Sequence, residues 1–536
     1  MTIQHSVSPL NLPTTTAWEL LAAALLLSAT YAAYVVLTSQ RPYPNIPLVG
    51  GEGGVSASKT RFARDAKGVL QSAWEQSKDR ICQIFTDSGP RILLPPSFVD
   101  EIRNEAHLSF TEFVRREFMG DYKTFGSTDS LFKDSVFQET VRIKLTQALP
   151  RLTVGLSNEA KLAVKQLFPT TDANTTYQSE WTTMKDPLYA TVVRLVSRLS
   201  AFAFLGSPLC RNETWQRISA QYTVDVMNAV VAFRRWPRVI RPLVYVFHPI
   251  LVPEIGRLQR CQKEAYSIIE PELRRRRMER KKAEELGGTK EKPLDSLQWL
   301  DETAAAKKSN VDTVMGQLGL TVAAIHTTSA ALTNVMFDIV AVPGLADELR
   351  EEIVRVMGDG GGEAGTPWQK TTLYKLRLMD SVMKESQRFN PPSVISMKRI
   401  ALAPHTLSDG TYVPRGASIG VPVLGMMDPA RYQDPETFDP YRFVKLRQQP
   451  GQENGWQYVT TSRDMFAFGH GAHACPGRFF ASNEIKIALV HLLMGWDWAF
   501  EEEGAGRPKT KMRADQMLPD GGVRLVCRRR ESEVAL

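Results

Sequence analysis

One cysteine near the end of the chain lies in a setting that could make it reactive. The stretch FAFGHGAHACPGRFFASNEIK, residues 466–486, places Cys475 among glycines and directly before a predicted helix. A cysteine binds metals as its thiolate, and the positive end of a helix stabilises that form. Gly469, Gly471 and Gly477 let the backbone approach closely and point amide N–H groups at the sulfur. The pattern predicts a thiolate held by backbone amides in a dry pocket.

Three interpretations of this cysteine are open from the local sequence. An iron–thiolate bond fits, because thiolate ligation of a haem iron donates electron density that favours O–O cleavage. Cys475 could instead be a small buried hydrophobic residue, a common role for a free cysteine. His470, His473 and Cys475 could also bind zinc, although their spacing is tight and no second pair of ligands lies nearby in the sequence.

A long apolar stretch, residues 312–342, carries a second group of residues that could do chemistry. It is apolar on most faces, which predicts a buried core helix rather than a membrane span. Within it, AAIHTTS places Ala323 and Thr327 on one helical face. A small side chain and a hydroxyl therefore share that face, whereas an isolated mid-helix threonine often bonds back to its own helix. His326 suits a proton relay by its ordinary pKa, or it shapes the helix, and the sequence leaves both open.

A third motif is an ion pair on a shorter predicted helix. In KESQR, Glu385 and Arg388 stand three residues apart and share a helical face. Alone, such a pair is usually a surface ion pair worth roughly a few tenths of a kcal/mol. Pro391 and Pro392 follow and end the helix.

These motifs, in this order, resemble those of the cytochrome P450 family. FGHGAHACPG is similar to the family's haem-binding signature, F-G-x-G-x-R-x-C-x-G. The resemblance implies a haem whose iron is ligated by Cys475, with Phe468, Gly469 and Gly477 beside it. The sequence departs from the signature at His473, where the family usually has an arginine that meets a haem propionate. A histidine can still donate a hydrogen bond, but its charge depends on pH.

The resemblance also covers the long helix. AAIHTTS looks like the family's oxygen-binding segment, A/G-G-x-D/E-T-T. It implies that Ala323 borders the haem and that Thr327 and His326 act in catalysis, with His326 standing where an acid is usual.

The Glu–Arg pair acquires a third member by the same resemblance. FDPYRF is similar to the segment whose arginine completes the family's Glu–Arg–Arg cluster. This implies that Arg442 joins Glu385 and Arg388 in a buried structural cluster that holds the cysteine loop. Removing one partner from such a cluster leaves an unpaired buried charge, which costs roughly 3 to 5 kcal/mol.

Other residues contact haem or substrate if the resemblance holds. Arg399, in SVISMKRIAL, stands where a family arginine binds a haem propionate, and a buried carboxylate needs such a cation. Val394 and Ile395 would then face the substrate. Arg142 or Lys144 could also reach a propionate, and the sequence does not decide between them.

Composition and charge are those of a globular protein with anionic partners. The chain has 536 residues, 43% of them hydrophobic, and a net charge of +8, which suits an acidic partner protein or anionic lipid. No basic, aromatic-rich module typical of nucleic-acid binding occurs. The five cysteines are scattered and include no CxxC pair. We therefore expect no disulfide framework and a protein that resides in a reducing compartment.

The N-terminus predicts a membrane anchor. Residues 20–37 carry no charge and are long enough to cross a bilayer as a helix. No Lys or Arg precedes them, which argues against a cleaved signal peptide. The first basic residue is Arg41, after the apolar stretch, so the positive-inside tendency places the N-terminus in the lumen. The predicted layout is a lumenal tail (1–16), a transmembrane helix (17–38), a proline-rich hinge (39–51) and one catalytic domain (52–536).

The expected fold is mainly α-helical with small β-sheets, a P450-like catalytic domain on a single-pass anchor at the endoplasmic reticulum, facing the cytosol. Residues 233–257 mix Arg with apolar residues and either lie on the membrane or form an ordinary loop between helices. Pocket walls are expected from residues 109–130, residues 201–236 and the turn at Gln516.

The expected function is monooxygenation of a hydrophobic small molecule by O2. The resemblance to fungal family members implies a terpenoid or related secondary-metabolite substrate and an NADPH-dependent cytochrome P450 reductase as electron donor, because no flavin or nicotinamide domain is recognisable in the sequence. Two alternatives remain: a haem-thiolate isomerase or dehydratase that needs no O2, and a non-catalytic membrane haem-binding protein.

Overall fold

A computed structural model describes residues 14–38, 41–77, 79–168, 180–287, 291–358, 368–534 and 536. Most of the predicted lumenal tail therefore lies outside the described residues, and its last three residues begin helix α1.

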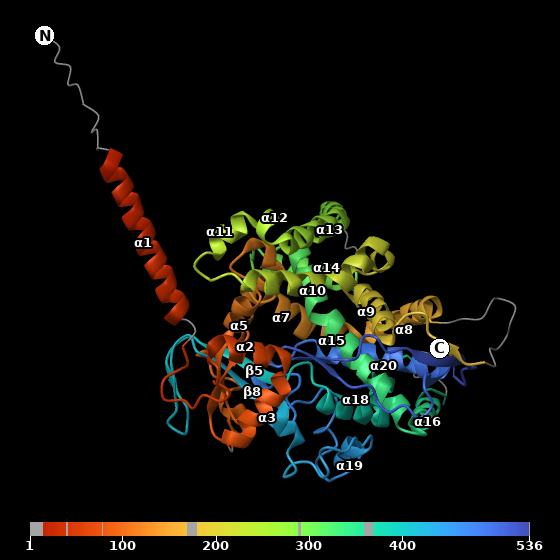
Figure 1. The fold of residues 1–536 in the computed structure, drawn as a ribbon. Coiled ribbons are helices and arrows are strands. Elements are labelled where there is room, and N and C mark those ends of the chain that lie inside the picture. The colour runs from red at the N-terminus through yellow and green to blue at the C-terminus, as the bar shows by residue number, and fades with distance from the viewer. Residues whose placement is uncertain are drawn as a thin grey trace.

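Helices dominate the chain, as predicted, and Figure 1 shows most of them packed together with α15 among them, while α1 stands apart. Apolar residues at helical spacing form these helices, and their apolar faces meet in the core. The α-helices are α1 (Thr14–Thr38), α2 (Gly54–Arg64), α3 (Ala66–Ser77), α4 (Val99–Ile102), α5 (Phe110–Glu117), α6 (Gly126–Ser130), α7 (Val136–Glu139), α8 (Thr146–Leu167), α9 (Leu188–Leu205), α10 (Glu213–Arg234), α11 (Arg241–Val246), α12 (His248–Leu251), α13 (Pro253–Glu285), α14 (Ser296–Ala306), α15 (Thr313–Ala341), α16 (Leu345–Gly358), α17 (Lys370–Lys375), α18 (Arg377–Phe389), α19 (Arg442–Arg447) and α20 (Arg478–Gly495).

The strands are short, and the largest sheet has the order β1-β2-β8-β5-β3. Strands β2 and β8 are parallel, and the other neighbours in this sheet are antiparallel. A smaller sheet has the order β4-β12-β9, and β6–β7 and β10–β11 are hairpins. The strands are β1 (Cys82–Thr86), β2 (Gly89–Leu93), β3 (Leu108–Ser109), β4 (Thr182–Thr183), β5 (Ile395–Ala401), β6 (His405–Thr406), β7 (Tyr412–Val413), β8 (Ser418–Pro422), β9 (Trp496–Phe500), β10 (Lys511–Arg513), β11 (Gln516–Leu518) and β12 (Leu525–Arg529).

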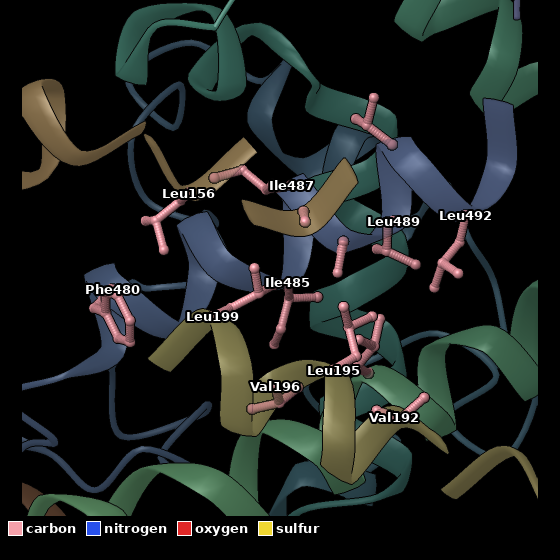
Figure 2. Packing of buried hydrophobic residues seen from close by; sticks show 14 of the residues in the cluster. Leu156, Val192, Leu195, Val196, Leu199, Phe480, Ile485, Ile487, Leu489 and Leu492 are labelled. Carbon is pink, nitrogen blue, oxygen red and sulfur yellow. The ribbon is translucent and has the colours of Figure 1, made fainter. Parts of the chain in front are cut away.

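Helix α20, which follows the cysteine loop, is the most deeply packed element near the site. Its residues from Ser482 to Gly495 are all buried, and they join the main hydrophobic core with α8, α9 and α15. Figure 2 shows Leu199 of α9 beside Ile485 of α20. A helix buried on every face cannot shift without opening cavities, so α20 fixes the position of the loop at its N-terminus.

The sheet region forms a second hydrophobic core on the other side of the site. It includes residues of α2, α3 and the five-stranded sheet, together with Met465 and Phe466, which lead into the cysteine loop. Strand β5 is irregular: its register against β8 shifts between Ser396 and Arg399, and Met397 between them has a φ of 51°. Such a bulge re-aims the side chains that follow it.

Among the described residues, three helices are long and apolar enough to cross a membrane, and they differ in how much of each is buried within the protein. The span Trp18–Leu37 in α1 is entirely exposed, whereas α9 and α15 are largely buried within the domain. The prediction that residues 312–342 form a core helix is therefore confirmed, and the exposed apolar span of α1 is compatible with a membrane anchor.

The stretch 233–257 is helical and carries apolar side chains on its surface. It contains the end of α10, the short helices α11 and α12, and the start of α13. Several of its large apolar residues are more than half exposed: Leu243, Val246, Phe247 and Ile250.

Candidate active site

The loop before α20 holds Cys475 by backbone hydrogen bonds. The Cys475 N–H donates to the Phe468 carbonyl at 2.8 Å, and the Gly469 N–H donates to the Phe466 carbonyl at 2.8 Å. Gly469 and Gly471 have φ values of 69° and 76°, a conformation that favours glycine. A Cβ on Gly471 would lie 2.6 Å from the Cβ of Arg103, so this loop also packs too closely for a side chain there.

Burial and the start of α20 shift the pKa of the Cys475 thiol in opposite directions. Burial raises the pKa of the Cys475 thiol, while the backbone N–H groups of Gly477 and Arg478 and the charge of Arg478 lower it. Of the three glycine amides predicted to point at the sulfur, that of Gly477 does so, whereas the Gly469 N–H donates to the Phe466 carbonyl. The other four cysteines, Cys82, Cys210, Cys261 and Cys527, are buried and free, and Cys475 is the cysteine that lines the cavity beside α15.

Helix α15 lines the same cavity. Ala323 and Thr327 are exposed although most of α15 is buried, because both face the cavity. The Thr327 hydroxyl donates to the Ala323 carbonyl at 2.8 Å. This is the back-bond that a mid-helix threonine often makes, and it leaves the oxygen lone pairs of Thr327 available to the cavity.

The cavity between Cys475 and α15 has a volume of about 160 Å³ and a mostly apolar wall. Beside Cys475 and α15, the wall includes Phe137, Val141 and Leu145 on one side and Tyr458, Phe468 and Phe480 on another. Its polar wall residues are few, and they include Asn334, Ser386, Gln387 and Asn390.

Arg399 is a buried cation without a carboxylate partner among the described residues. It is 2% exposed, its Nη1 donates to the Lys398 carbonyl at 2.8 Å, and its Nε and Nη2 have no hydrogen-bond partner there. Burial lowers the pKa of Arg399 to about 10. Its guanidinium lies 5.4 Å from the centre of the Phe110 ring, which in turn lies 6.0 Å from the His473 ring. The structure thus brings Arg399 and His473 to the same place.

Strand β5 contacts the cysteine loop directly. The Ser396 hydroxyl donates to the Phe466 carbonyl at 2.9 Å, and the His470 N–H donates to the Met397 sulfur at 3.1 Å. The bulge at Met397 therefore sits against the loop and sets the direction of Arg399 beyond it.

The zinc interpretation finds no support. Among the residues that the structure describes, no three His, Cys, Asp or Glu side chains gather in a way that could hold a metal ion. His470 is bonded instead to Arg103 at 3.2 Å and to Thr461 at 3.0 Å.

The three-member cluster expected behind the loop is present. Arg388 donates to the two carboxylate oxygens of Glu385, and Arg442 donates to one of them at 3.0 Å. Arg442 also donates to the carbonyls of Asp434 and Thr437, and Arg388 donates to that of Met426. The cluster therefore joins α18 to the segment that leads into α19.

His326 lies next to Thr327 in sequence but points away from the cavity. Its Nδ1 is 3.0 Å from the Tyr189 hydroxyl on α9, and its Nε2 is 3.0 Å from the Ala220 carbonyl on α10. It is not part of the cavity wall. Burial lowers the pKa of His326.

Several other predicted residues lie elsewhere than expected. Val394 and Ile395 are buried in the sheet core and do not line the cavity; Pro392 and Met517 do. Lys144 pairs with Glu302 at 3.5 Å, and Arg142 is exposed near Arg478.

The expected wall segments contribute unevenly. Residues 109–130 supply no wall residue, residues 201–236 supply Phe204, and the turn at Gln516 supplies Met517. No local pattern pointed to Tyr458, which lies in a loop, whereas the spacing of Val141 and Leu145 could have indicated two wall residues on one helical face.

The residues present fit a haem. A thiol faces an apolar cavity at a helix N-terminus, and a buried guanidinium at Arg399 lacks the anionic partner that a haem propionate would supply. A fold of packed helices with small sheets, together with this site, is typical of haem-thiolate proteins.

Comparison with known proteins identifies the family. The family model described as Cytochrome P450 matches residues 141–525. The chain is 38% identical to the Cytochrome P450 monooxygenase ntnM of Nectria sp over 91% of this chain and 89% of that protein. It is 37% identical to the Cytochrome P450 monooxygenase hepE of Aspergillus oryzae, over 94% and 90%. A crystal structure of the cytochrome P450DA heme domain has the same fold, with a TM-score of 0.65 at 16% identity, over 92% of this chain and 98% of that one.

The chain belongs to the cytochrome P450 family, and its relatives are monooxygenases of fungi. The family and fold imply a haem with a cysteine thiolate on the iron, and Cys475 is the cysteine of the haem-binding signature.

Proposed function

We propose that this protein hydroxylates or otherwise oxidises a hydrophobic small molecule, a terpenoid or a related fungal secondary-metabolite intermediate, with O2 and electrons from an NADPH-dependent reductase. One observation carries the proposal: Cys475 and the Ala323–Thr327 face of α15 line the same largely apolar cavity. A haem bound by a thiolate supplies reductive O–O cleavage and insertion of oxygen into a C–H bond.

The residues of this chain would prepare the site for that chemistry. Ala323 leaves space above the haem plane because its side chain is a single methyl group. Thr327 holds a hydroxyl at the cavity wall, where it can pass a proton toward bound oxygen. Apolar walls keep water out and so limit wasteful proton transfer. Arg399 would hold a propionate, and the Glu385 cluster would keep the cysteine loop in place.

The cavity wall and the relatives support the proposed class of substrate. Phe137, Phe204, Leu320 and Met517 offer large apolar contacts and few hydrogen-bond partners, which suits a hydrocarbon-rich molecule. The relatives come from fungi and are named as cytochrome P450 monooxygenases, which supports a fungal small-molecule substrate. The net charge of +8 would help an acidic reductase to dock.

Membrane attachment belongs to this proposal. Helix α1 would span the bilayer of the endoplasmic reticulum, with residues 39–51 as the hinge and the catalytic domain on the cytosolic side. The exposed apolar residues of α11 and α12 would form a second contact with lipid, and the exposed Arg235 and Arg238 beside them suit anionic headgroups. Hydrophobic substrates would then reach the enzyme from the membrane.

The test is spectroscopic and then chemical. The reduced, carbon-monoxide-treated protein should give the red-shifted Soret band of a thiolate-ligated haem, and Cys475→Ala should abolish that band. A panel of terpenoids should include members that shift the resting spectrum and that are oxidised when NADPH and a reductase are added. A protein without the red-shifted band, or a variant that keeps it, would sink the proposal.

A further inference from the structure

His326 is the side chain that connects the middle of α15 to its neighbours by hydrogen bonds. In the part of the chain that the structure describes, the hydroxyls of Thr321, Thr327, Ser329 and Thr333 all bond to carbonyls within α15. His326 alone between Gln317 and Asn334 has side-chain hydrogen bonds that reach other helices there, to Tyr189 of α9 and Ala220 of α10.

The Ala220 carbonyl requires a hydrogen on one imidazole nitrogen, and burial, which lowers the pKa of His326, favours the neutral ring. The Ala220 carbonyl can only accept a hydrogen bond, so the Nε2 of His326 must carry the hydrogen. The Nδ1 then has a lone pair and accepts from the Tyr189 hydroxyl. The ring is neutral in this arrangement, and both of its nitrogens are used away from the cavity.

This stretch of α15 requires stabilising contacts with other helices. Side-chain hydroxyls that bond to the carbonyl four residues back bend and weaken a helix, and four of them follow one another here. Ala323 and Thr327 occupy the exposed face of this stretch, where no side chain packs over them in the described structure.

We propose that His326 is a positioning residue that ties the Ala323–Thr327 turn of α15 to α9 and α10, and that it does not itself relay protons. The inference rests on the proposed function, because the turn it fixes carries the hydroxyl that would serve bound oxygen. A relay would need a nitrogen facing the cavity, and His326 is not part of the cavity wall.

An acid at this position separates the two roles. A carboxylate could accept from Tyr189 but could not donate to Ala220, and it would place a negative charge against a carbonyl oxygen. His326→Glu should therefore impair a positioning residue severely, whereas it should preserve a proton relay. His326→Leu loses both bonds, and Tyr189→Phe, at a residue that does not line the cavity, loses one of them.

The experiment uses the full-length, haem-loaded protein and two readouts that need no substrate. The first is hydrogen–deuterium exchange of peptides that cover residues 318–330. The second is the C–O stretching band of the reduced, carbon-monoxide-treated protein, which reports on polar groups near the bound gas. Tyr441→Phe is the matched control, because the Tyr441 hydroxyl bonds only to Glu348 on the surface.

Tyr189→Phe and His326→Leu should each raise the exchange rate of this turn several-fold and broaden or shift the C–O band, and His326→Glu should do so more strongly. Unchanged exchange and an unchanged band in both Tyr189→Phe and His326→Leu would overturn the inference, as would a His326→Glu protein that matches the wild type. A wild-type protein that gives no thiolate-type carbon monoxide spectrum would instead overturn the proposed function.

Discussion

Arg388 donates two hydrogen bonds to Glu385, at 2.7 and 2.9 Å, and both side chains are fully buried. Ion pairs of this kind are costly to break because the remaining charge has no access to water. Glu385→Gln keeps the shape of the side chain but leaves two guanidinium groups uncompensated. The free energy of unfolding should fall by roughly 3 to 5 kcal/mol, measured by chemical denaturation.

The control for this variant is an exposed pair on α13. Glu270 bonds Arg274 at 2.6 Å, with both side chains about half exposed or more. Glu270→Gln should change the unfolding free energy by about 1 kcal/mol or less. Equal effects of the two substitutions would show that the cluster is not a structural clip.

Much of this site could be predicted because its signals are local. Glu385 and Arg388 share a helical face by their spacing alone, and Ala323 and Thr327 do so on α15. Cys475 lies at a helix N-terminus because Pro476 and Gly477 precede the apolar run of α20. The resemblance to a family then added Arg442, which lies 57 residues from Glu385 and which no local pattern connects to it.

The rest depended on long-range geometry. The bulge at Met397 changes which residues of β5 face the site, so Val394 and Ile395 enter the sheet core instead of the cavity wall. The orientation of His326 depends on partners on α9 and α10, more than one hundred residues away. Neither a register shift nor a distant hydrogen-bond partner leaves a periodic trace in the sequence.

Arg399 should contribute more to haem retention than to the stability of the haem-free protein. Arg399→Leu removes a buried cation that lacks an anionic partner among the described residues, so the haem-free chain should be no less stable than the wild type. The haem-loaded protein should lose haem about tenfold faster or more, which corresponds to about 1.4 kcal/mol. The measurement is haem transfer to excess apomyoglobin. Arg415→Leu, at an exposed position, is the control, and equal rates in the two variants would argue against a propionate at Arg399.

Glu484 should make stability depend on pH. It is fully buried on α20, it accepts from the Ser200 hydroxyl at 2.7 Å, and burial raises its pKa to about 8. Between the ordinary glutamate pKa near 4.5 and a pH of about 8, the folded chain keeps a proton that the unfolded chain has released. This group should therefore lower the unfolding free energy as pH rises through that window, by up to about 1.4 kcal/mol per pH unit.

Glu484→Gln should remove this dependence, because the amide stays neutral and can still accept from Ser200. Chemical denaturation should be measured at about pH 5.5 and about pH 7.5, which both lie inside this window. The unfolding free energy of the variant should exceed that of the wild type by an amount that grows with pH. Glu503→Gln on the surface should show no such trend. A gain that shrinks as pH rises would contradict the raised pKa.

The α11–α12 surface should bind lipid without the anchor. A chain that lacks residues 1–38 should still sediment with vesicles that contain anionic lipid, and less with neutral vesicles, because Arg235 and Arg238 attract anionic headgroups. Glutamate at Val246 and Ile250, which are 68% and 82% exposed, should abolish the sedimentation. Met278→Glu on α13, 66% exposed, should leave it unchanged. Binding that survives the two glutamates would assign membrane contact to another surface.

Thr327 should decide how efficiently oxygen is used. Thr327→Ala removes the hydroxyl from the cavity wall and leaves a helix backbone that alanine favours. Haem content and the carbon monoxide spectrum should stay as in the wild type. With a terpenoid that the wild type oxidises, the NADPH consumed per product should rise several-fold, and the difference should appear as hydrogen peroxide, because protons no longer reach bound oxygen in the required order.

Thr327→Ser is the matched control for this prediction. Serine keeps a hydroxyl that can donate to the Ala323 carbonyl as Thr327 does at 2.8 Å, so its ratio of product to NADPH should stay near that of the wild type. An isomerase or dehydratase of the same class would form product without NADPH, and Thr327→Ala would change its turnover little. A Thr327→Ala protein with unaltered coupling would therefore remove the threonine from oxygen activation, even if Cys475 ligates the haem as described.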